Sequence, residues 1–228
     1  MLKTLTATSY TLLAHLAVQE WSAFDLAKQM TRGLDLVWPR AESAMYQEPK
    51  NLVAHGLASG RKERVGKART RTIYAITAEG RDALADWLSV PSAPPQFESE
   101  ALVRVFFAET GSKAALLSAI RSIDDHGAAI EQRLKAQITG YLRDGGPYPD
   151  RWQLIALGTR FLLDYAAVCR QWSQWAAAEA DQWASIEAGA GVAPELLRDN
   201  LSRIGDRPLR SLVIPQNNLG GVQPAGPA

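Results

Sequence analysis

Six basic residues crowd into eleven consecutive positions of the chain. The segment Arg61–Arg71 (RKERVGKARTR) contains six Lys and Arg against one Glu, a net charge of +5. A block this dense repels itself unless water or an anion neutralises it. Because phosphate is an anion that such a surface suits, the segment indicates contact with the backbone of a nucleic acid.

A second group of polar residues precedes the basic block. Arginine and glutamine can make paired hydrogen bonds to base edges, and tyrosine can donate to phosphate. Taken singly, these side chains could equally be a solvated helix face. As a set beside the basic block, they favour DNA contact. The DNA-binding residues that the sequence predicts are Arg40, Ser43, Tyr46, Gln47, Lys50, Lys67, Arg69 and Arg71.

Hydrophobic periodicity supplies the elements that would position these residues. Helices are expected over residues 4–18, from Ser22 to Gly33 and from Pro39 to Gly56. Two strands follow, at 63–65 and 70–77, and Thr77 caps a fourth helix. This is the order of a winged helix-turn-helix, in which the third helix enters the major groove and the hairpin contacts the backbone or minor groove.

Beyond residue 90 the sequence changes character. Three prolines mark a linker at 91–97, and helices are expected over 99–108, 112–143 and from 149 to about 186. The longest follows a heptad pattern, which requires a partner helix; its apolar positions are Leu116, Ile120, Ile123, Gly127, Ile130, Leu134 and Tyr141. The predicted fold is mainly α, with a winged helix-turn-helix domain (1–90), the linker (91–97), an all-helical dimerisation and effector domain (98–186), and a partly disordered tail (187–228).

The segment after the basic block carries a resemblance to a known family. Tyr74-Ala75-Ile76-Thr77-Ala78-Glu79-Gly80 resembles the Tyr-x-Leu-Thr-x-x-Gly string of the PadR (phenolic-acid-decarboxylase regulator) family of bacterial transcription factors. Upstream, Met45-Tyr46, Leu52 and Gly56-Leu57 match the string that runs through that family's third helix. Pro49 stands where the family has leucine, and proline at this position predicts a kink. The arm resembles that of the larger, virulence-activator-like members.

The resemblance implies a DNA-binding transcription regulator that is not an enzyme. It implies a homodimer, joined through the C-terminal helices, that acts as a repressor on a palindromic operator and is released by a small aromatic effector. A cytoplasmic location without membrane contact is expected. The alternative is a winged-helix module that binds proteins and does not bind specific DNA; such a module has no need of a strongly basic wing.

Two tryptophans of the arm are the candidates for effector binding. Trp172 and Trp175 lie three residues apart on one predicted helix, a spacing that favours core packing over a ligand site. No catalytic motif is present, and the three histidines lack partners at metal-ligand spacing, so neither cofactor nor metal is expected. The single cysteine, Cys169, lies in an apolar stretch and is expected to be buried.

Overall fold

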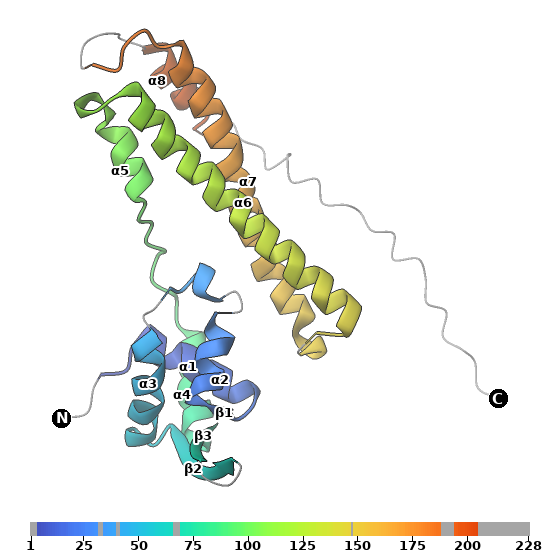
Figure 1. The fold of residues 1–228 in the computed structure, drawn as a ribbon. Helices are drawn as coiled ribbons and strands as arrows, with labels where there is room; N and C mark the ends of the chain where they lie inside the picture. Colours follow the sequence, from blue (N-terminus) through green and yellow to red (C-terminus); the bar gives the residue numbers. More distant parts are fainter. Residues whose placement is uncertain are drawn as a thin grey trace.

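A computed structural model of the chain describes residues 4–31, 34–39, 42–65, 69–146, 148–187 and 194–204, with the backbone alone for 42–44 and 69. Its elements fall into two groups, an N-terminal group that includes a small sheet and a C-terminal group of helices (Figure 1). We call the first group the winged-helix part, and helices α6 and α7 of the second group the arm.

The winged-helix part follows the order that the sequence predicts. Its helices are α1 (Ala7–Val18), α2 (Ala23–Met30), α3 (Glu42–Ala54) and α4 (Ala78–Ser89), with the 3-10 turn η1 (Leu34–Leu36) between α2 and α3. Its strands are β1 (Trp21–Ser22), β2 (Ala58–Val65) and β3 (Arg69–Ile76), which form an antiparallel sheet in the order β1-β3-β2. The fold class that the sequence predicts is confirmed.

Local capping explains where several of these helices begin. The side chains of Thr6, Ser22 and Thr77 each accept a hydrogen bond from the backbone N–H three residues later. This bond satisfies a donor that the first helical turn otherwise leaves unpaired. The amphipathic helices then bury a shared core; its members include Leu12, Leu13, Leu16, Leu26, Met30, Met45, Leu52, Leu57, Tyr74 and Leu84.

The arm is a helical hairpin. The C-terminal helices are α5 (Glu100–Phe106), α6 (Lys113–Asp144), α7 (Trp152–Gln182) and α8 (Pro194–Ser202), with 3-10 turns η2 (Ala108–Thr110) and η3 (Pro149–Arg151). The heptad positions of α6 that are buried pack towards α7: Leu116, Ile120, Gly127, Ile130 and Leu134. The partner helix that the pattern requires is therefore supplied, along this face, by the same chain.

A glycine sets how closely the two arm helices approach. A Cβ atom at Gly127 would lie 2.8 Å from the backbone oxygen of Ala166 and 3.1 Å from Cβ of Cys169. Because real Cβ contacts are longer, only glycine permits this spacing. Cys169 is buried here, as its apolar surroundings predict.

Several boundaries differ from the sequence expectations. Helix α3 begins at Glu42 rather than Pro39, and the 3-10 turn η1 precedes it in the chain. Helix α7 ends at Gln182, about four residues early, and the two-residue strand β1 was not expected. Helix α3 runs unbroken through Pro49, whose ring is buried. The expected helix end at Gly33 and the tail beyond residue 204 lie outside the described residues.

Residues 91–99, which include the proline linker, form neither helix nor strand and are exposed except at Ser99. Among the described residues, no helix is long and apolar enough to span a membrane.

Candidate nucleic-acid interface

Helix α3 has one buried and one outward side. Met45, Glu48, Pro49 and Leu52 face the core, while Gln47 and Lys50 are exposed and Tyr46 is half-buried. The predicted contacts of this helix therefore emerge on a common side, because Lys50 lies four residues after Tyr46 and three after Gln47. Ser43 belongs to α3, but its side chain lies outside the described ones, as does the whole of Arg40.

The buried side of α3 contains a carboxylate that the sequence analysis did not single out. Glu48 is only 1% exposed, and its Oε1 accepts a 2.5 Å hydrogen bond from Oγ of the fully buried Ser9 on α1. Nδ2 of Asn51 donates to the same oxygen at 3.0 Å. These bonds fix α3 against α1, and hence fix the direction in which Tyr46 and Gln47 point.

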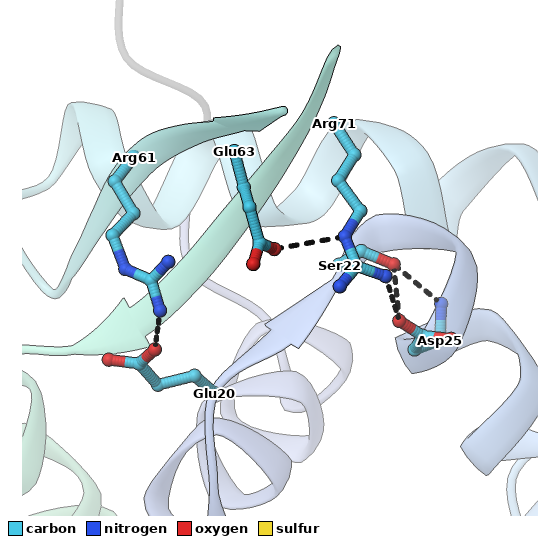
Figure 2. A network of polar contacts seen from close by, with 6 residues as sticks. All are labelled: Glu20, Ser22, Asp25, Arg61, Glu63 and Arg71. Carbon is cyan, nitrogen blue, oxygen red and sulfur yellow. Dashed lines mark hydrogen bonds and ion pairs between the residues drawn. The ribbon is translucent and has the colours of Figure 1, made fainter. Parts of the chain in front are cut away.

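The wing is the hairpin of strands β2 and β3, and one of its faces forms ion pairs, two of them with residues of the helices and connections beside it (Figure 2). Nε of Arg71 donates to Oε2 of Glu63 at 3.0 Å, and Nη1 lies 3.7 Å from Oδ2 of Asp25. On the same face Arg61 forms an ion pair with Glu20. These side chains remain between a third and three-fifths exposed, so each pair contributes at most about 1 kcal/mol to the free energy of unfolding. The same exposure leaves the cations accessible to phosphate.

The other face of the wing presents cations without such pairing. Lys62 and Arg64 are exposed opposite Thr72 and Thr70, and no ion pair joins either cation to another described residue. Strand register separates these two residues from Arg61 and Glu63, because neighbours in a strand point to opposite faces. Lys62 and Arg64 belong to the basic block of residues 61–71, and the strand register assigns their face.

The remaining predicted wing residues are only partly placed. Arg69 pairs with Val65 in the register, but its side chain is not among those described. Lys67 lies outside the described residues. Of the predicted DNA-binding residues, the structure thus places Tyr46, Gln47 and Lys50 together on α3 and puts Arg71 in the paired network of the wing.

A cavity of about 470 Å³ lies between the winged-helix part and the arm. Its walls combine helix α1, the turn η1 and both arm helices. Its aromatic and polar members include Trp21, Trp87, Tyr141, Tyr148, His15, Gln137 and Arg151. The volume and the largely apolar lining with a few polar groups are typical of sites for small molecules.

His15 stands in the wall of this cavity, with its Nδ1 2.9 Å from the backbone oxygen of Thr11. Burial, together with the charge of Arg151, lowers the pKa of His15 below its usual 6.5 and outweighs the hydrogen bond to Thr11, which raises it. The imidazole is therefore neutral at pH 7.

Acidification is expected to destabilise the protein through His15. Below about pH 6.5 the unfolded chain binds a proton at this histidine while the folded chain does not, so the free energy of unfolding falls as pH falls. Urea unfolding at pH 7.5 and 5.5 measures this. The free energy of unfolding should fall less between the two pH values in His15→Gln than in wild type. In His126→Gln, a change at an exposed histidine of the arm, it should fall as much as in wild type. Equal losses in all three proteins would refute the assignment.

The two tryptophans predicted for effector binding do not share a cavity. Trp172 lines a second hollow of about 420 Å³, together with Phe97, His126 and Tyr165. Trp175 is absent from its lining and is 41% exposed. Burial is the larger cause, and a hydrogen bond with Cys169 the smaller one, of the rise in the pKa of Tyr165 to about 12. This phenol therefore stays protonated. In the described part of the chain no cluster of His, Cys, Asp or Glu could hold a metal ion.

Comparison with known proteins decides the family. Residues 12–86 match the Transcriptional regulator PadR-like family, which spans the core of the winged-helix part from α1 to α4. This match assigns the winged-helix part of the chain to the PadR-like family. The winged-helix part is therefore that of a DNA-binding transcription regulator, and the family named by the sequence resemblance is confirmed.

Solved structures share the fold over most of the chain. PadR of Bacillus subtilis in complex with operator DNA is 20% identical with a TM-score of 0.61, covering 77% of this chain and 99% of that one. The same PadR in complex with p-coumaric acid is 19% identical with a TM-score of 0.57, covering 78% and 100%. The Vibrio cholerae virulence activator AphA is 19% identical with a TM-score of 0.58, covering 77% and 98%. The comparison with curated proteins finds no match.

Proposed function

We propose that this PadR-like regulator is a homodimeric repressor that binds a palindromic operator through helix α3 and the wing. The observation that carries the proposal is the common outward side of Tyr46, Gln47 and Lys50 next to a hairpin whose Lys62 and Arg64 are exposed and form no ion pair with another described residue. Base-reading side chains on a helix and phosphate-binding cations on a wing are the two components of recognition by this fold. The PadR structure with operator DNA supports the same use.

The partner proposed for the arm is a second copy of the chain. Helix α7 exposes apolar residues at intervals of three, four and seven on a face other than the one packed on α6: Leu154, Leu157, Phe161, Val168 and Trp175. Phe106 and Phe107, at the end of α5, are also exposed. Such a stripe has the spacing of a helix–helix seam. We accordingly propose residues 98–186 as the dimerisation domain, joined by the linker 91–97 to a DNA-binding domain of residues 1–90.

The proposed effector site is the cavity between the winged-helix part and the arm. PadR of Bacillus subtilis has been solved with p-coumaric acid, a planar aromatic carboxylate. In this chain the cavity offers aromatic walls at Trp21 and Trp87 and a cation at Arg151, which suit a molecule of that chemistry. Because both parts of the chain contribute to the lining, an occupant would change how they sit together and weaken operator binding. This placement replaces Trp172 and Trp175 as the favoured effector contacts.

Fluorescence-anisotropy titration of DNA from upstream of the protein's own gene tests the proposal. Binding should resist competitor DNA, weaken with salt and decrease on addition of p-coumaric acid. Size-exclusion chromatography with light scattering should give the mass of a dimer. Binding that is weak and indifferent to sequence would favour the protein-interaction module instead.

Two double variants test separate pairs of basic residues in the segment 61–71. Lys62→Ala/Arg64→Ala and Lys67→Ala/Arg69→Ala should each weaken binding to all DNA sequences and reduce the slope of log affinity against log salt by about one per lost phosphate contact. Lys135→Ala, which removes an exposed cation from the arm, is the matched control and should leave the slope unchanged. An unchanged slope in either double variant would exclude that pair from the DNA interface.

A further inference from the structure

The turn η1 is anchored in both parts of the molecule. Leu34 packs against the core of the winged-helix part, whereas Leu36, two residues later, packs against an arm cluster. That cluster consists of Ile130, Leu134, Leu162 and Ala166. A single short turn thus joins two hydrophobic cores, and it lies between α2 and α3.

An ion pair fastens the same turn to α6. Nη1 of Arg133 donates to Oδ2 of Asp35 at 2.8 Å, and Nη2 donates to Oδ1 at 2.6 Å. Nη2 also donates to the backbone oxygen of Thr31, the C-cap of α2, at 2.5 Å. Both side chains are 35% exposed, which leaves the pair less screened by water than the ion pairs of the wing. The two parallel N–H···O bonds also fix the orientation of the Arg133 guanidinium relative to the Asp35 carboxylate, which a single bond would not do.

The fastened segment leads directly into helix α3. The backbone N–H groups of Val37 and Trp38 donate to the oxygen of Leu34, at 3.1 and 2.7 Å. Nε1 of Trp38 donates to Oγ1 of Thr8 on α1 at 3.2 Å. A shift of Arg133 relative to α1 would therefore displace the chain immediately before α3, the helix that carries Tyr46 and Gln47.

The interdomain cavity borders this contact. Leu34 and Val37 line it from the turn, and Leu134, the neighbour of Arg133, lines it from α6. A molecule in the cavity would consequently contact Leu34 and Leu134, the chain neighbours of Asp35 and Arg133.

We propose that Arg133 and Asp35 are positioning residues for DNA recognition. Their ion pair holds the entrance of α3 at one place relative to the arm, so operator affinity depends on a contact that touches no DNA. This inference rests on the operator binding proposed above, and it assigns to the arm a second role, beyond pairing with its twin.

Arg133→Gln and Asp35→Asn test the inference in the full-length chain, with two readouts. Operator affinity should fall about fivefold or more in each, a coupling of ordinary size for distant sites. The double variant should be no worse than either single one, because both remove the same interaction. Arg133→Lys, which keeps the charge, should recover part of the affinity. Arg160→Gln is the control, since Arg160 forms its ion pair with Asp164 inside α7, and it should bind like wild type.

The second readout is hydrogen exchange at the amides of Val37 and Trp38. Exchange there should become faster in Arg133→Gln, while the slope of affinity against salt stays as in wild type because no phosphate contact is lost. Wild-type affinity in Arg133→Gln, a reduced salt slope, or faster exchange throughout the chain would each overturn the positioning role. A wild-type chain that binds no operator would instead overturn the proposed function, and the exchange experiment would still report whether the ion pair holds the turn.

Discussion

Replacing Gly80 with alanine is expected to unfold the winged-helix part while the arm stays helical. A Cβ atom at this position would lie 2.1 Å from the backbone oxygen of Leu57 and 2.9 Å from Cγ1 of Ile76. The oxygen cannot retreat easily, since it accepts a 3.1 Å hydrogen bond from the N–H of Thr77. Overpacking against backbone of this kind costs about 3 kcal/mol or more, a large share of the stability of a small domain.

Circular dichroism and near-ultraviolet signals during thermal unfolding would measure this loss. Gly140→Ala, at an α6 position where a Cβ would meet no described atom within 4 Å, is the matched control. That change should stabilise its helix by up to about 1 kcal/mol, because alanine is the better helix former. A Gly80→Ala protein that unfolds at the wild-type temperature would show that helix α4 can move away from Leu57 at little cost.

The second large effect is expected at Glu48. Glu48→Ala would leave the hydroxyl of the fully buried Ser9 without its acceptor and would open a cavity beneath α3. An unsatisfied buried donor and the lost packing together cost about 2–4 kcal/mol. Operator binding should weaken as well, because the hydrogen bond holds the recognition helix against α1.

Glu48→Gln distinguishes the hydrogen bond from the packing. The amide retains the shape of the side chain and an acceptor oxygen for Ser9, so the loss measured by urea unfolding should be well under half of that in Glu48→Ala. If the alanine variant is as stable as the glutamine variant, the Ser9–Glu48 bond contributes little and α3 is held by its apolar residues alone.

Local sequence signals were sufficient for much of this fold. Thr77 caps α4 as predicted, and Ser112 caps α6 at the predicted start of that helix, because a cap needs only a hydroxyl side chain next to an amphipathic run. Five of the seven heptad positions of α6 are buried for a similarly local reason. The family string Tyr74–Gly80 also has a physical basis, since its glycine is the residue that allows α4 to touch Leu57.

Features that depend on distant contacts were not predictable in the same way. The turn at Leu34–Leu36 was not predicted, and it is held by Arg133, some hundred residues away. Strand β1 exists only through its pairing with β3. Glu48 resembled one more solvated charge on a helix, and its burial depends on Ser9 of α1. The pairing of Arg71 with Glu63 and Asp25 likewise requires the strand register and the position of α2.

The glycine contact inside the arm has a mechanical consequence. Two helices whose backbones touch at Gly127 cannot slide freely past one another, so α6 and α7 move as one stiff lever about 48 Å long at 1.5 Å per residue. Figure 1 shows this lever extending well beyond the winged-helix part. Arg133, which holds the turn before α3, lies twenty residues, or about 30 Å, from the first residue of α6, and a tilt of a few degrees about Arg133 is magnified in proportion to that distance. If a second copy of the chain binds along the arm, a small displacement of one winged-helix part would therefore require a larger displacement of the other.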